Sequence, residues 1–543
     1  MNYKDRAKEW LESPFIDEDT KREIREMDDK TLEDSFFTEL EFGTGGLRGV
    51  MGAGTNRMNV YTVRAATYGL AKDLLGSGED ISRGVVIAHD SRNNSAKFAK
   101  EAAAVLSGCN IKAYLFESLR PTPELSFAVR HLGCVRGIVI TASHNPKEYN
   151  GYKAYGEDGG QIPPDTAARI LKEIRSVSPA SEIPLAEGKY ISIGKAIDDE
   201  YVKAIRGESF GEDMGDLRVI YTPLHGAGRM PVERVLSESG VKNLYIVEEQ
   251  REPNGDFPTV KSPNPENKEA FDIAIAYAKE HPADVIIGTD PDSDRIGVVV
   301  PERDGSFTVL NGNQTGVLLC DYILTKTKEK GMPTDGRVVK TIVTTEMVRA
   351  VADSYGVKTV DVLTGFKYIG DKIKEYEKGG ETYLFGLEES YGYLRGTYAR
   401  DKDAVVASML VCELAASLKK RGITLTERLH ELYRTYGFHK ERLISYTFKG
   451  ISGMERIASL MKQVREMPTL DGETERLDYL NGIDGLPKSD VMKYFLNDGW
   501  IAVRPSGTEP KIKFYIAAVA ESAELCDAKL DAREKMLRDI VGE

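Results

Sequence analysis

The chain is poor in cysteine, with five among 543 residues and no C-x-x-C pair. An odd number of scattered cysteines predicts neither a disulfide framework nor a thiolate zinc site. These residues are Cys109, Cys134, Cys320, Cys412 and Cys526. Because such usage is typical of a reducing compartment, we expect a cytoplasmic protein.

Long hydrophobic runs are also missing. The first 29 residues are charged throughout and hold no apolar segment of the signal-peptide type. No later run approaches the ~20 apolar residues that a membrane-spanning helix needs. We therefore predict that the protein has no membrane partner.

The sequence has no excess of positive charge, since 73 Lys and Arg face 86 Asp and Glu for a net charge of −13. An acidic surface does not attract nucleic acid or anionic membranes, which makes a nucleic-acid partner unexpected. Any phosphate-bearing ligand must be bound by local groups.

What the chain does have is length and a repeating pattern. At ~100–200 residues each, its 543 residues predict about three to five domains. Short β-branched runs alternate with amphipathic stretches, which indicates α/β layers with strands buried on both faces. Three such units each place a polar loop after a short strand, with the sequences TASHNP, TDPDSDR and GLEESYG. Loops at the carboxyl ends of strands bind ligands in open α/β sheets, so we expect the three to face one cleft.

The pattern changes near Gly437 to strands around the loop RPSGTEP followed by a helix, which predicts a smaller α+β domain. The fold class is thus three similar α/β domains and a smaller C-terminal α+β domain around a central cleft. The predicted boundaries are a helical arm at 1–40 and domains at 41–206, 207–308, 309–430 and 431–543.

A serine hydrolase is one interpretation of Ser143. The chain's G-x-S-x-G string, at residues 207–211, lacks the preceding strand and following helix of a nucleophile elbow and is interpreted as a linker. Ser143 has no elbow glycines, and His144 is its immediate neighbour, which makes a proton relay hard to build. A phosphate acceptor and a residue that caps a turn are the other two interpretations.

The loop TDPDSDR carries Asp290, Asp292 and Asp294 at alternate positions. An extended backbone, favoured by Pro291, would let three carboxylates converge. Such carboxylates either bind a cation or have raised pKa values, and a hard divalent ion is the simpler solution. An EF-hand is excluded because Arg295 and Pro301 replace its glycine and glutamate. The alternative is a solvated acidic turn.

Three further stretches offer groups for a sugar phosphate. The residues of 504–508 supply a guanidinium, two hydroxyls and a glycine amide, as a phosphate cradle or a plain hairpin turn. Glu388 and Ser390 can bind vicinal hydroxyls, although a strand-end glutamate is more often a cap or an ion-pair partner. FGTGGLRG, at 42–49, matches no nucleotide-binding motif and is expected to be a flexible loop that presents Arg48 to a phosphate.

With TASHNP, TDPDSDR, GLEES and RPSGTEP in this order, the sequence closely resembles the α-D-phosphohexomutase superfamily. FGTGGLRG, LTGFKYIG and the N-terminal arm are most similar to its phosphoglucomutase branch, which includes phosphopentomutases and bisphosphate synthases. The resemblance implies a phosphoserine enzyme that interconverts glucose 1-phosphate and glucose 6-phosphate through glucose 1,6-bisphosphate, as a monomer or weak homodimer. Mg²⁺ and glucose 1,6-bisphosphate as priming activator are the implied cofactors.

The resemblance also implies residue roles. Ser143 is the phosphoserine, and it binds the metal together with the three aspartates. The implied catalytic residues are Ser143, His144, Lys153 and Arg48. The implied substrate-binding residues are Arg295, Thr364, Gly365, Glu388, Ser390, Arg504, Ser506, Gly507 and Thr508. Gly392 stands where some relatives have a histidine. Phosphomannomutase, phosphopentomutase, glucose 1,6-bisphosphate synthase and a non-catalytic sugar-phosphate sensor are the alternatives.

Overall fold

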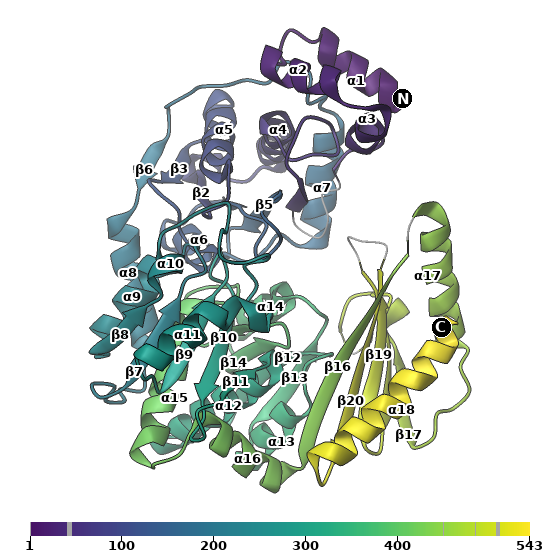
Figure 1. Cartoon of the computed structure of the whole chain (residues 1–543). Coiled ribbons are helices and arrows are strands. Elements are labelled where there is room, and N and C mark those ends of the chain that lie inside the picture. The colour runs from purple at the N-terminus through teal and green to yellow at the C-terminus, as the bar shows by residue number, and fades with distance from the viewer. Residues whose placement is uncertain (1, 41–45, 449, 484, 507–510, 543) are drawn as a thin grey trace.

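The chain forms four β-sheets that follow one another around the molecule. A computed structural model describes residues 2–40, 46–448, 450–483, 485–506 and 511–542. Figure 1 shows the N-terminal unit at the top and the C-terminal unit at the lower right. The predicted fold class, three α/β units and a smaller α+β unit, is confirmed. The domain boundaries stay a prediction.

The first unit contains a six-stranded sheet in the order β1-β5-β4-β2-β3-β6. Its strands are β1 (Gly46–Val50), β2 (Val85–His89), β3 (Ala113–Phe116), β4 (Arg136–Ile140), β5 (Tyr149–Gly156) and β6 (Ile191–Ile193). Its helices are α4 (Val60–Ser77), α5 (Ser95–Gly108), α6 (Thr122–His131) and α7 (Pro164–Arg175), with a 3₁₀ turn at Ile81–Arg83. Alternate residues of β2 enter two different cores, which buries this sheet on both faces.

The second unit has five strands in the order β11-β10-β9-β7-β8. They are β7 (Arg218–Thr222), β8 (Asn243–Ile246), β9 (Val285–Thr289), β10 (Ile296–Pro301) and β11 (Phe307–Leu310). The helices are α8 (Lys195–Gly207), α9 (Arg229–Glu238), α10 (Glu248–Arg251) and α11 (Asp272–Glu280), with a 3₁₀ turn at Lys268–Phe271.

The third unit has four strands in the order β13-β12-β14-β15. They are β12 (Gly336–Thr341), β13 (Lys358–Val362), β14 (Thr382–Glu388) and β15 (Gly392–Leu394). The helices are α12 (Gly312–Lys330), α13 (Met347–Ser354), α14 (Phe366–Tyr376), α15 (Ala404–Lys420) and α16 (Leu425–Tyr436).

The three sheets share one topology. Strands β2, β7 and β12 each pair in parallel with the next two strands of their unit, and the second of these, β4, β9 or β14, pairs antiparallel with the strand that follows it. TASHNP lies between β4 and β5, TDPDSDR between β9 and β10, and GLEESYG between β14 and β15. Each loop also contains a left-handed non-glycine residue, at Ser143, Ser293 and Tyr391. The repeat predicted from the sequence is therefore a repeat of topology, with the functional loop at an equivalent position.

The C-terminal unit is an antiparallel sheet in the order β16-β20-β19-β18-β17. Its strands are β16 (Phe438–Thr447), β17 (Glu473–Asp478), β18 (Met492–Leu496), β19 (Gly499–Pro505) and β20 (Lys511–Ala520). Helices α17 (Gly450–Arg465) and α18 (Ala523–Val541) and a 3₁₀ turn at Tyr479–Asn481 complete it. Trp500 and Tyr515 of this sheet share a core with Ile342 and Leu363 of the third unit, so the two units are packed together.

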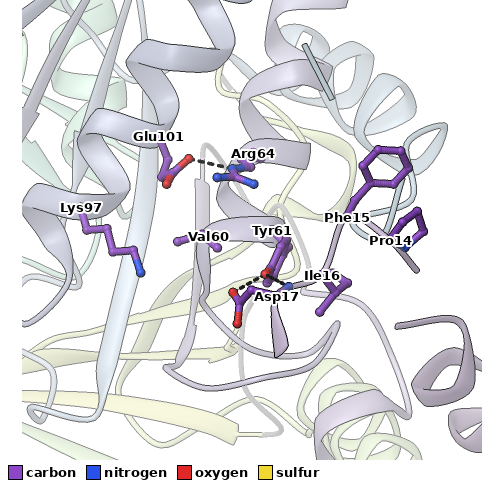
Figure 2. A pocket seen from close by; sticks show the side chains of 9 residues that line it. All are labelled: Pro14, Phe15, Ile16, Asp17, Val60, Tyr61, Arg64, Lys97 and Glu101. Carbon is purple, nitrogen blue, oxygen red and sulfur yellow. Dashed lines mark hydrogen bonds and ion pairs between the residues drawn. The ribbon is translucent and has the colours of Figure 1, made fainter. Parts of the chain in front are cut away.

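An N-terminal arm of three short helices lies on the first unit. They are α1 (Tyr3–Glu12), α2 (Glu18–Glu26) and α3 (Asp29–Phe36). Asp17 caps α2 and accepts a 2.5 Å hydrogen bond from the hydroxyl of Tyr61 on α4. A hollow of about 310 Å³ lies at this junction, lined by the arm, α4 and α5 (Figure 2). Its lining includes the ion pair of Arg64 with Glu101 but no residue of the three functional loops.

Helix length and polarity bear on the membrane prediction. Within the described ranges, none of the helices combines the length and apolar content that a membrane crossing requires.

Candidate functional site

The loop after β4 fixes Ser143 in a strained backbone conformation. Ser143 has φ of +53°, and its amide donates to the Thr141 hydroxyl at 2.8 Å. The buried guanidinium of Arg92 donates to the carbonyls of Ser143 and Asn145 and to two more at 146 and 149. A positive φ in a non-glycine residue persists only when its surroundings impose it. Sequence reasoning missed Arg92, whose only signal was its place just after strand β2 in GVVIAHDSR.

The Ser143 hydroxyl lies between an acid and an imidazole. Its Oγ donates to Asp290 Oδ2 at 2.9 Å and lies 3.2 Å from His144 Nδ1. Burial, followed by the charges of Arg295 and Arg48, lowers the pKa of His144 well below its usual range. His144 is therefore neutral. The sequence predicts that a proton relay between these neighbours is hard to build, and the structure nevertheless brings their side chains within 3.2 Å, with Ser143 in a left-handed conformation.

The loop TDPDSDR, at 289–295, is a tight turn, which corrects the predicted extended backbone. The backbone carbonyl of Asp290 accepts from the Ser293 amide at 2.9 Å. The side-chain Oδ1 of Asp290 accepts from the amides of Asp294 and Arg295 at 3.1 and 3.0 Å. Ser293 has φ of +52°. The carboxylates converge because the backbone folds around the Asp290 side chain, rather than because alternate residues of a strand share one face.

All three aspartates are buried, and two lysines from other units face them. Lys153 Nζ, on β5, donates to Asp292 Oδ2 at 2.9 Å. Lys402 Nζ, just before α15, lies 2.7 Å from Asp294 Oδ2. Although burial opposes the shift, Lys153 holds the pKa of Asp292 below its ordinary value, and Asp294 raises that of Lys402. Burial, followed by Asp292 and Asp294, raises the pKa of Asp290 well above its usual range.

These residues fit a hard divalent cation. Oxygens of Asp290, Asp292 and Asp294 lie within 4.8 Å of one another. The Oδ1 atoms of Asp292 and Asp294 are buried and have no hydrogen-bond partner among the described residues. A carboxylate oxygen without a partner in a buried site is costly unless a cation or polar group occupies the space beside it. The Ser143 hydroxyl lies at the edge of this set.

Lys402 is the second residue that sequence reasoning missed. Its only signal was a lysine between two aspartates at 401–403, which also fits an exposed charged turn. Gly392 explains its position, because a Cβ there would lie 2.4 Å from Lys402 Cδ. The absence of a histidine at 392 thus leaves the space through which Lys402 reaches the carboxylates.

The loop GLEESYG, at 386–392, is the predicted sugar-binding loop and is called the sugar loop below. Its residue Glu388 lies at the end of β14 and is 5% exposed. Burial raises its pKa to about 7, although Lys402 opposes the shift. Arg295 pairs with Glu266 and lies 3.8 Å from Asp294. Despite burial, Glu266 and Asp294 raise the pKa of Arg295, which keeps it charged. Ser390 follows β14, in the turn before β15.

Thr364 and Gly365 precede α14, and Gly365 is its N-cap with φ of +121°. The Thr364 hydroxyl and the Lys367 amine are both buried and make no hydrogen bond within the described residues. Burial also lowers the pKa of Lys367. Polar groups in this state are suited to a ligand that supplies the missing partner. Lys367 was not predicted.

The phosphate-cradle residues lie on the C-terminal sheet. Arg504 is near the end of β19, and the Ser506 amide donates to the Lys511 carbonyl at 2.7 Å. Gly507 and Thr508 lie outside the described residues.

The expectation that Arg48 lies on a loop is wrong, because Gly46–Val50 form strand β1 paired with β5. Its Nη1 reaches Asn145 Oδ1 at 3.5 Å, which places it beside the Ser143 loop.

The assembled groups are those of phosphoryl transfer. A hydroxyl beside a carboxylate set can carry a phosphate, and lysine and arginine can stabilise its charge. A serine hydrolase is not supported, because no described carboxylate hydrogen-bonds the His144 ring to orient it.

Four family models match the chain in order. They describe the Phosphoglucomutase/phosphomannomutase alpha/beta/alpha domains I, II and III and the C-terminal domain, at residues 39–180, 199–305, 311–436 and 455–535.

Similar proteins span the same length. A Phosphoglucomutase of Staphylococcus epidermidis is 38% identical over 517 residues, which cover 91% of this chain and 93% of that protein. A Phosphoglucomutase of Staphylococcus aureus is 36% identical, with 97% of both chains covered. A crystal structure of a Phosphoglucomutase/phosphomannomutase family protein from Burkholderia thailandensis matches this chain with a TM-score of 0.71 at 20% identity. The match covers 92% of this chain and 97% of that chain and shows that the two share a fold.

The role of Arg92 can be tested by hydrogen exchange. Because a lysine cannot donate to four carbonyls at once, we expect Arg92→Lys to raise amide exchange rates within 143–150 by about tenfold or more. Arg83→Lys is the matched control, since Arg83 also donates to loop carbonyls, at 133 and 134, but lies away from Ser143. Equal protection of 143–150 in Arg92→Lys and the unmodified chain would contradict this account.

Proposed function

The chain belongs to the phosphoglucomutase/phosphomannomutase family, and we propose that it is a phosphoglucomutase that interconverts glucose 1-phosphate and glucose 6-phosphate. The observation that carries the proposal is the contact of Ser143 Oγ with Asp290 inside the buried carboxylate set. The names of the Staphylococcus relatives favour glucose as the sugar.

Ser143 is the phosphate carrier in this mechanism. Its phosphoryl group passes to O6 of glucose 1-phosphate as the bond from phosphorus to Ser143 Oγ breaks, and the O6 proton leaves to a base. The resulting glucose 1,6-bisphosphate then reorients in the site, so that its O1 phosphate faces Ser143. Ser143 Oγ then attacks the phosphorus on O1, the O1 oxygen takes up a proton, and glucose 6-phosphate is released. Glucose 1,6-bisphosphate also primes an unmodified Ser143.

Three groups beside the Ser143 loop and the carboxylates are the candidates for proton transfer. His144 Nδ1 lies 3.2 Å from Oγ of unmodified Ser143, and the lowered pKa of His144 favours the neutral ring, which can act as a base. Lys153 and Arg48 lie on neighbouring strands β5 and β1, and Arg48 is directly opposite Gly151 in their register. They are the candidates to stabilise negative charge or move a proton at the sugar oxygen.

The buried carboxylates are the proposed metal ligands. Asp290, Asp292 and Asp294, with an oxygen of phosphorylated Ser143, would hold Mg²⁺, which when bound supplies positive charge to neutralise the transferring phosphate. Lys153 and Lys402 keep these side chains in place from two other units.

The remaining groups orient the sugar phosphate. Glu388 and Ser390 bind sugar hydroxyls, while Arg295 contacts the transferring phosphate. Arg504, Ser506, Gly507 and Thr508 bind the phosphate that does not react. Thr364, Gly365 and Lys367 supply donors at the start of α14. Because the phosphate-binding residues belong to the C-terminal unit, we expect closure of that unit to accompany binding.

The carrier role of Ser143 is the first test. Peptide mapping of freshly purified protein is expected to find phosphate on Ser143, and Ser143→Ala should lower Mg²⁺-dependent formation of glucose 6-phosphate by at least about 10³-fold. Ser209→Ala, in the G-x-S-x-G string, is the control and should stay within about twofold. Unmodified Ser143 without turnover, even after priming with glucose 1,6-bisphosphate, would reject the proposal. A preference of more than about tenfold for mannose 1-phosphate or ribose 1-phosphate would change the sugar.

The raised pKa of Glu388 predicts a pH effect. Below about pH 7 the buried carboxyl group is protonated and accepts hydrogen bonds from sugar hydroxyls less well. We therefore expect kcat/KM to rise with pH through an ionisation near 7. Glu388→Gln should lower kcat/KM and remove this ionisation, while the ionisation of the substrate phosphate remains as an internal control. An unchanged pH profile in Glu388→Gln would contradict the assignment.

A further inference from the structure

A buried lysine joins the C-terminal unit to the third unit. Lys493, on β18, is 0% exposed, and its Nζ donates to the Ile342 carbonyl at 2.6 Å and to Glu346 Oε1 at 3.2 Å. The ammonium also lies 4.4 and 4.8 Å from the ring centroids of Phe495 and Trp500. Both of these hydrogen-bond acceptors belong to the turn that follows β12.

That turn also holds the sugar loop. The hydroxyls of Thr341 and Thr344 hydrogen-bond Glu389 Oε2 at 3.1 and 3.4 Å and each other at 2.8 Å. Glu389 directly follows the sugar-loop residue Glu388, and its carbonyl packs so closely on Gly312 that a Cβ there would lie 2.0 Å away. Residues 341–346 therefore contact both Lys493, through Ile342 and Glu346, and the sugar loop, through Thr341 and Thr344.

The acceptor for Lys493 is already paired within the third unit. Glu346 accepts from Lys340 at 2.9 Å and from Arg349 at 2.8 Å, and Lys340 also pairs with Asp361 at 3.0 Å. A second buried lysine adds a large desolvation cost that an apolar side chain in this interface would avoid. Buried ionic contacts of this kind give a defined geometry more readily than they give stability.

The same sheet carries the phosphate-binding arginine. Lys493 is paired with Ala502 in the register of β18 and β19, and Arg504 is two residues further along β19. Tyr515 of β20 is paired with Ala502 on the other side of β19, and the charges of both Glu389 and Arg504 act on it. Burial raises its pKa, and the charge of Glu389 raises it further.

We propose that Lys493 is a positioning residue that sets the C-terminal phosphate-binding residues in register with the sugar loop, through the turn 341–346. The inference rests on the proposed function, since it assumes that Arg504 and Glu388 bind opposite parts of one sugar phosphate. Lys493 itself touches neither the sugar nor the phosphate.

The test is a double-mutant cycle between Lys493 and Glu389, whose side chains both contact residues 341–346. Affinity for glucose 6-phosphate is measured by calorimetry in the full chain carrying Ser143→Ala, which prevents turnover. We expect Lys493→Met and Glu389→Gln each to weaken binding by about tenfold, and the double variant to be no more than about threefold weaker than either single variant.

A merely structural role for Lys493 gives a different result. If the two effects multiply, or if Lys493→Met binds as tightly as its parent, the proposal is wrong. Lys529→Met is the matched control, because Lys529 is a half-buried lysine of the same unit that pairs with Asp498. Its small effect on affinity for glucose 6-phosphate should multiply with that of Glu389→Gln. Lys493→Gln, which keeps a hydrogen-bond donor, replaces Lys493→Met if the latter does not fold. Turnover of the unmodified chain is measured separately, so failure of the proposed function is seen there and not in the cycle.

Discussion

The structure depends on the compensation of three buried carboxylates. Asp290, Asp292 and Asp294 lie on one turn of the second unit, and each is at most 1% exposed. Without positive charge close by, three such groups would have to take up protons or the turn would open. Lys153 of the first unit pairs with Asp292, and Lys402 of the third unit pairs with Asp294, so these ion pairs hold three units around one point. The proposed function uses this same charge.

The repeated topology explains how the groups meet. In the three α/β units, the loops between β4 and β5, β9 and β10, and β14 and β15 leave the carboxyl ends of parallel strands, where ligands bind in such sheets. A left-handed residue in each loop turns the chain sharply, so that Ser143 reaches Asp290 from another unit. The C-terminal sheet is antiparallel and carries Arg504, which we propose binds phosphate together with Ser506. In the proposed function, the three equivalent loops carry the chemistry and the fourth unit adds recognition of phosphate.

The sequence predicted the fold class, the three loops and the convergence of the Asp triplet, because these depend on local pattern and order along the chain. It missed Arg92 and Lys402, whose roles arise from contacts between residues far apart in sequence and whose local context is a common charged turn. It placed Arg48 on a loop because glycines obscured a five-residue strand that exists only through its pairing with β5. The extended metal loop was wrong because alternation alone cannot reveal that Asp290 hydrogen-bonds the backbone of its own turn.

The most direct measurement of this account is Mg²⁺ binding to the full-length protein by calorimetry, compared with Asp292→Asn. Asp292 Oδ1 has no hydrogen-bond partner among the described residues, so its loss should remove a ligand without breaking the turn. The account predicts one ion per chain and an affinity at least about tenfold weaker in the variant. Absence of saturable binding, or equal affinity in both proteins, would contradict the central claim that the buried carboxylates form a metal site.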